Sequence, residues 1–166
     1  MDTKTVSERD MEQLVDWRAA VIAGLIAGAI FLPLLMIGRA YLTGGSIWIM
    51  PRYIAAIVLG TDVLPPPPTF DAGIFVVALL LHFALSLIFA LVLAAIIHEW
   101  ELVVGIVVGA LFGVALYAIN YYTFSRFFPW FYPARSWVDL LAHVIFGMVA
   151  GGAYEALEIE RFVPED

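Results

Sequence analysis

Two histidines lie inside long apolar stretches, and these two residues are the best placed in the chain to do chemistry. His82 lies in the run LLLHFALS, and His143 lies in the similar run LLAHVIFG. Each run belongs to a stretch of the length that crosses a bilayer, about 20 residues. An ionisable side chain at membrane depth costs about 3 kcal/mol or more, so such a residue is by default a candidate for function. The repeated pattern predicts that the two histidines lie at similar depths.

One chemistry open to such a pair is the ligation of a b-type haem. Histidine is a common axial ligand of haem iron, and helix bundles often hold cofactors between facing helices. In this hypothesis His82 and His143 are the two axial ligands. The haem propionates would pair with arginines near the ends of the helices and in the connections. The candidates for that pairing are Arg39, Arg52, Arg126 and Arg135.

A simpler interpretation is that both histidines are interior polar residues with local partners and that no cofactor is bound. Ser86 follows His82 by four residues, and Asp139 precedes His143 by four residues, so each pair shares a helix face. Asp139 also completes the capping pattern S-x-x-D that begins at Ser136, which predicts a structural role at a helix N-terminus. We favour this interpretation over haem ligation. A proton relay and a contact with a quinone remain as alternatives.

The elements that carry the histidines must be membrane helices. The chain of 166 residues is 63% hydrophobic and 14% charged, with a mean hydropathy of +0.96, far from the composition of soluble globular proteins. We predict an all-α, polytopic membrane protein with a four-helix bundle. The predicted membrane domain covers residues 17–157, between an acidic segment at 1–16 and an acidic tail at 158–166. Its helices are expected near 17–42, 73–97, 102–122 and 136–157, with a short interfacial helix near 51–59 and an amphipathic turn near 7–17.

Glycines at helical spacing mark the faces on which these helices should pack. Gly24 and Gly28 lie in the first predicted helix; Gly105, Gly109 and Gly113 lie in the third. Small residues one turn apart allow another helix to come close. The pattern G-x-x-x-G-A-(I/L)-F occurs in both helices, which indicates either an internal duplication of a helical hairpin or a chance likeness of two apolar helices.

One part of the chain resembles a known family. The runs PRYIAAIVLG, VLPPPPTFD and HFALS, between residues 51 and 86, are similar to those of small uncharacterised bacterial membrane proteins with four helices. Some members of that family carry the label sodium:proline symporter-like. True symporters of that name have many more helices, and nothing in this sequence matches their sodium site. The resemblance therefore implies a membrane location and no particular activity.

The sequence lacks the motifs that several classes of function require. The sequence has no H-E-x-x-H, no G-x-S-x-G, no phosphate loop and no cysteine, so we predict that the protein is not an enzyme. A net charge of −7, concentrated at the chain ends, argues against nucleic acid as a partner. The aromatic segment at 123–135 suits either a belt at the membrane surface or a docking surface.

We expect a non-catalytic accessory subunit of a larger inner-membrane complex, such as one of electron transport, with the lipid bilayer and other membrane subunits as partners. The alternatives are a small b-type cytochrome and a homo-oligomeric transporter or channel. Four spans place both termini on one side of the membrane. The positive charges divide equally between the two sides, so the positive-inside rule does not choose. We expect cytoplasmic termini in a bacterial inner membrane, because the long connections suit the outer side.

Overall fold

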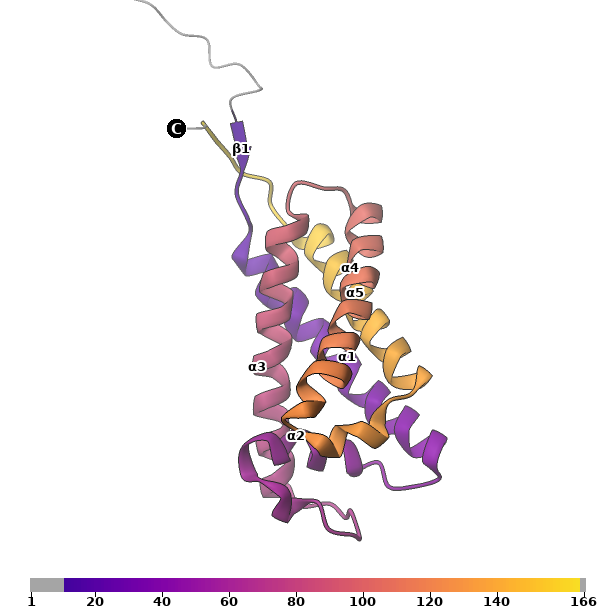
Figure 1. Cartoon of the computed structure of the whole chain (residues 1–166). Coiled ribbons are helices and arrows are strands. Elements are labelled where there is room, and N and C mark those ends of the chain that lie inside the picture. Colours follow the sequence, from indigo (N-terminus) through magenta and orange to yellow (C-terminus); the bar gives the residue numbers. More distant parts are fainter. Residues whose placement is uncertain (1–10, 165–166) are drawn as a thin grey trace, which may run out of the picture.

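Four long apolar helices make up most of the molecule, a computed structural model that describes residues 11–164 (Figure 1). They are α1 (Trp17–Thr43), α3 (Ala72–Ile97), α4 (Leu102–Ala118) and α5 (Trp137–Leu157). The third apolar span is completed beyond α4 by a π-helical turn, η3 (Ile119–Thr123), and a 3₁₀ turn, η4 (Phe124–Arg126). The predicted all-α, four-helix membrane bundle is confirmed, and the protein is a multi-pass membrane protein.

Helix α1 joins the two halves of the bundle. It packs against both α3 and α5, while α4 packs chiefly on α5. Its buried face consists mainly of alanine and glycine, which lets both neighbours approach its backbone. The core contains small residues from α1 together with larger ones such as Leu93, Phe146 and Tyr154. The rest of the helix surfaces is apolar as well, as a bilayer requires.

All five glycines predicted at packing faces lie at helix contacts within the chain. A Cβ atom added to Gly109 would overlap the carbonyl oxygen of Gly147, and one added to Gly113 would overlap that of His143. Gly105 lies against Glu155, and on α1 the residues Gly24 and Gly28 face Ala90 and Ser86 of α3. Each glycine face thus packs on the next long helix of the chain, α1 on α3 and α4 on α5.

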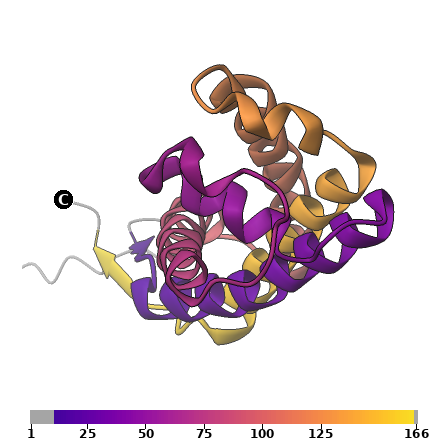
Figure 2. The same cartoon turned by 90° about the horizontal axis from the view of Figure 1, so that it is seen from below.

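A short helix, α2 (Ile49–Leu59), lies across the end of the bundle that carries the long connections (Figure 2). Its 11 residues are too few to cross a bilayer, and it packs mainly on α3. The 3₁₀ turns η2 (Thr61–Val63) and η5 (Pro129–Ala134) belong to the connections. Arg52 of α2 donates to the carbonyl oxygens of Val63 and Thr69 and so ties down the connection to α3.

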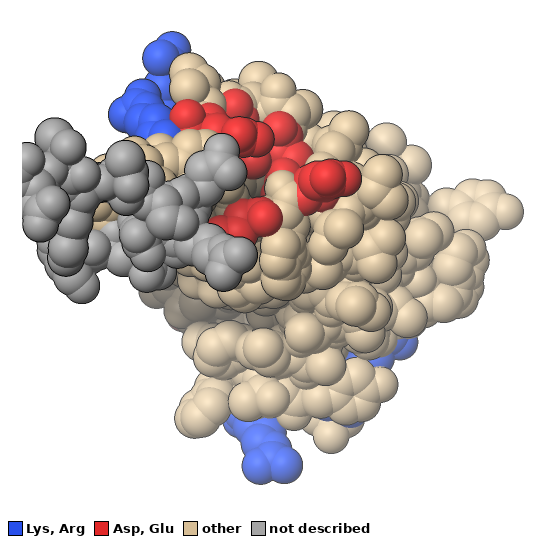
Figure 3. Space-filling model, turned by 90° about the horizontal axis from the view of Figure 1, so that it is seen from above, with Lys and Arg blue, Asp and Glu red and all other residues tan. Residues whose placement is uncertain are grey.

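At the opposite end the two chain termini meet in a small sheet. Strand β1 (Met11–Gln13) pairs antiparallel with β2 (Phe162–Pro164). The predicted amphipathic turn near 7–17 is therefore wrong at residues 11–13, because the C-terminal tail supplies backbone hydrogen bonds that a sequence-local argument does not see. Residues 7–10 of that prediction lie outside the described residues. Acidic side chains gather at this end (Figure 3).

Asp16 fixes the start of α1 at the same end. Its carboxylate accepts hydrogen bonds from the backbone N–H groups of Arg18 and Ala19, as an N-cap does, and from that of Ile159 in the C-terminal segment. These bonds, the one from Ala19 foremost, lower the pKa of Asp16. Asp16 therefore joins the start of α1 to the C-terminal segment.

Candidate functional site

A cavity of about 280 Å³ lies among the helices, toward the end with the long connections. All the long helices contribute to its wall, and so do α2 and the aromatic segment after η3. Most of the wall is apolar, and six of the lining residues are phenylalanines: Phe31, Phe89, Phe124, Phe128, Phe131 and Phe146. The polar lining residues are His82, Ser86, Asn120, Tyr121 and His143. The fold thus brings the two predicted histidines to one site.

Phe31 of α1 contacts both histidine rings. Its ring is stacked against that of His82 with a centroid distance of 5.7 Å, and it meets the His143 ring edge-on at 4.7 Å. The Phe31 side chain therefore links the two halves of the site. Sequence reasoning did not single it out, although it lies in the repeated pattern that also contains Gly24 and Gly28.

His82 bonds to another helix and not to its predicted local partner. Its Nε2 donates to the carbonyl oxygen of Gly28 at 2.8 Å. That carbonyl is within reach because α1 and α3 are close where Gly28 faces Ser86. The expectation that Ser86 bonds His82 is wrong. Ser86 is a buried residue of the cavity wall; its hydroxyl lies beside Gly28 of α1 and forms no hydrogen bond with the residues that the structure describes.

His143 has partners for both ring nitrogens. Its Nδ1 donates to the backbone carbonyl oxygen of Asp139 at 2.7 Å, and its Nε2 accepts from the Asn120 side-chain amide at 3.2 Å. The carboxylate of Asp139, which the sequence suggested as the partner, faces elsewhere. These bonds define the neutral tautomer of His143 that carries its proton on Nδ1.

This arrangement does not fit a bis-histidine haem. Iron ligation through Nε2 would break the bonds to Gly28 and Asn120, and a porphyrin between the rings would have to displace Phe31. Among residues 11–164 no group of three or more His, Asp or Glu side chains could hold a metal ion either. An absorption spectrum of the natively purified protein is the direct check on haem.

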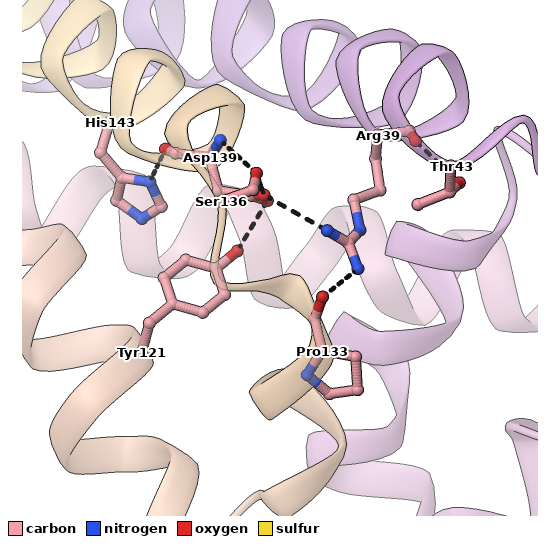
Figure 4. A network of polar contacts seen from close by, with 7 residues as sticks. All are labelled: Arg39, Thr43, Tyr121, Pro133, Ser136, Asp139 and His143. Carbon is pink, nitrogen blue, oxygen red and sulfur yellow. Dashed lines mark hydrogen bonds and ion pairs between the residues drawn. The ribbon is translucent and has the colours of Figure 1, made fainter.

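Beside the cavity lies a buried ion pair that the sequence did not predict (Figure 4). The Arg39 guanidinium is 3.6 Å from the Asp139 carboxylate, and the two side chains are only 5% and 0% exposed. Arg39 also donates to the carbonyl oxygen of Pro133. Asp139 accepts from the hydroxyls of Ser136 and Tyr121, which satisfies most of the buried carboxylate. The predicted cap is present as well, because Ser136 Oγ accepts from the Asp139 N–H.

The other three arginines assigned to haem propionates lie elsewhere. Arg52 is bonded to the α2–α3 connection, as described above. Arg135 donates to the Tyr121 carbonyl and to Ser125 Oγ, and its guanidinium lies over the rings of Tyr122 and Tyr132. Arg126 is exposed. The structure therefore does not gather the four arginines around one group.

The aromatic segment at 123–135, predicted as either a membrane-surface belt or a docking surface, lies partly against the cavity and partly at the surface. Phe124, Phe128 and Phe131 line the cavity, whereas Phe127 is exposed. Trp130 donates its indole N–H to the backbone carbonyl of Tyr53 in α2. The segment thus closes one end of the cavity and still presents rings at the surface.

No protein-family model, curated protein or solved structure matches this chain. The resemblance to small bacterial membrane proteins therefore stays a prediction. The function has to be inferred from the cavity and the groups around it.

Proposed function

We propose that this chain is an integral membrane protein that binds a small lipid-soluble molecule in the cavity between its helices. The observation that supports the proposal is the composition of the cavity wall. Sites for small molecules are mostly apolar and carry a few polar groups that orient the ligand, and here six phenylalanines surround a few polar side chains. Polar groups at membrane depth are costly, which favours a use for them.

A role as an accessory subunit of a larger membrane complex is compatible with ligand binding and stays a proposal. The glycine faces are occupied by helices of the same chain and leave no face for a partner helix there. What supports a partner now is the exposed part of the aromatic segment, such as Phe127 and Tyr132. Recovery of stoichiometric membrane subunits with the natively purified protein would support this role, and a monodisperse protein without partners would contradict it.

The ligand proposal can be tested by filling the cavity. Leu85 lines the cavity, whereas Leu80 on the same helix is 69% exposed on the outer surface. Leu85→Trp should occupy the space that a ligand needs, and Leu80→Trp should place the same side chain in lipid. Both variants and the unmodified protein are purified from their native membrane, and the bound small molecules are extracted and identified by mass spectrometry.

We expect one compound to copurify with the unmodified protein and with Leu80→Trp, at roughly one molecule per protein. The same compound should be strongly depleted in Leu85→Trp. The thermal unfolding curves of both variants show whether the fold is retained. Equal recovery of all compounds from the three proteins would overturn the proposal, because bulk lipid carried along with the bundle behaves in that way.

A further inference from the structure

We infer that the cavity recognises an aromatic ring that carries a hydroxyl group, as in a phenol or the head group of a quinol. The inference rests on the proposed binding function and specifies the chemistry of its ligand. It comes from the hydrogen-bonding capacity that remains at His82 and Ser86 after the bonds within the protein are made.

The bond between His82 and Gly28 determines what His82 can offer a ligand. A carbonyl oxygen can only accept, so the Nε2 atom bonded to the Gly28 carbonyl must carry the ring proton. In the neutral ring Nδ1 is then an acceptor, and no residue among 11–164 donates to it. A ligand that binds at His82 should therefore bring a donor.

Ser86 supplies the complementary group. It lies one helical turn after His82, it is 3% exposed, and it lines the same cavity. Its hydroxyl can donate to a ligand oxygen. A ligand hydroxyl can donate to His82 and accept from Ser86 at once, whereas a ketone or an ether oxygen can only accept.

The walls select the remainder of the ligand. Phenylalanine rings from four parts of the fold line the cavity, among them Phe31, Phe89, Phe128 and Phe146. Aromatic rings pack well in edge-to-face and offset arrangements, so a flat ring is preferred over a branched aliphatic chain. A volume of about 280 Å³ suits one substituted ring, since it lies just below the range of about 300–1,000 Å³ for small-molecule sites.

The test uses three probes that differ in the polar group alone: 4-ethylphenol, 4-ethylanisole and ethylbenzene. The full chain, labelled with ¹⁵N-histidine, is placed in phosphatidylcholine nanodiscs at neutral pH, where a phenol keeps its proton. Saturable binding is measured as the difference between the unmodified protein and Leu85→Trp, which removes partitioning into lipid. Ser86→Ala is the matched polar variant.

We expect 4-ethylphenol to bind about tenfold more tightly than the other two probes, and Ser86→Ala to reduce that preference. One histidine Nδ1 resonance should move when 4-ethylphenol binds, and it should stay in place with 4-ethylanisole or in Leu85→Trp. Equal saturable binding of all three probes would overturn the inference but leave the binding function standing. No saturable binding of any probe would overturn both.

Discussion

At the scale of single residues, Arg39 and Asp139 form an ion pair between two helices of the bundle. Both side chains are buried, and they come from α1 and α5. A buried charge is tolerated when it is paired and hydrogen-bonded. The hydroxyls of Ser136 and Tyr121 and the carbonyl of Pro133 supply those further bonds. The pair therefore fixes the position of α5 relative to α1 next to the cavity.

Removing the arginine should destabilise the protein strongly. Arg39→Met leaves the Asp139 carboxylate buried without a counter-charge, and we expect the free energy of unfolding to fall by about 3–5 kcal/mol. The double variant Arg39→Met/Asp139→Asn should recover part of that loss, because the amide is neutral and can still bond Ser136 and Tyr121. Unfolding by heat or denaturant in detergent micelles measures these two variants and the single variant Asp139→Asn.

The matched control for this prediction is Arg52→Met, which removes bonds to two carbonyl oxygens and no ion pair. Its effect should be smaller, about 1–2 kcal/mol. If the double variant is as unstable as the sum of its two single changes, the pairing of Arg39 with Asp139 does not stabilise the fold as argued.

At the scale of elements, contact between the backbones of α4 and α5 sets the geometry of that half of the bundle. Gly109 and Gly113 of α4 face Gly147 and His143 of α5, with no room for a side chain between them. Because His143 is part of this contact, the same packing positions a polar residue of the cavity wall.

Adding one methyl group should force these helices apart. We expect Gly109→Ala to lower the free energy of unfolding by about 1–3 kcal/mol, the range for overpacked interiors. It should also weaken ligand binding, since α5 moves with His143. Gly73→Ala is the control: the site is exposed near the start of α3, and the added Cβ would lie 3.3 Å from Asp71 Oδ1 and not against another helix, so its effect should be smaller than that of Gly109→Ala. Equal melting temperatures for the two variants would contradict the close packing of α4 on α5.

At the scale of the whole molecule, the bundle has two unlike ends. One end carries the terminal sheet and the acidic side chains; the other carries α2 and the aromatic segment (Figures 1 and 3). The short turn between α3 and α4 belongs to the end with the termini. With four spans, the connections at one end of the bundle lie on one side of the membrane, and those at the other end lie on the opposite side.

Because the chain contains no cysteine, single introduced cysteines can report that topology. We expect a membrane-impermeant maleimide added to intact cells to label Gly45→Cys and Phe127→Cys, and to label Glu12→Cys and Glu99→Cys only after the membrane is opened. All four positions are exposed. The reverse pattern would overturn the cytoplasmic assignment of the termini. A mixed pattern, with positions 12 and 99 on different sides, would contradict the four-span bundle itself.

The membrane class, the four spans and the placement of both histidines within them follow from the sequence alone. These properties are local, because the length and hydropathy of a stretch decide whether it crosses a bilayer. The Ser136 cap of α5 and the glycines at packing faces also follow from short-range patterns. The hydrophobicity of long membrane helices is nearly uniform around their circumference, however, so their sequence does not predict which side faces which neighbour.

The surroundings of the histidines depend on contacts between helices and could not be predicted from the sequence. The partner of His82 is a carbonyl on α1, Phe31 lies against both imidazoles, and Arg39 pairs with Asp139 100 residues later in the chain (139 − 39). The strands at the termini pair across nearly the whole chain. Each of these contacts depends on the rotation and depth of one helix relative to another. Backbone approach at glycines and buried polar bonds set that rotation and depth, and both involve residues far apart in the sequence.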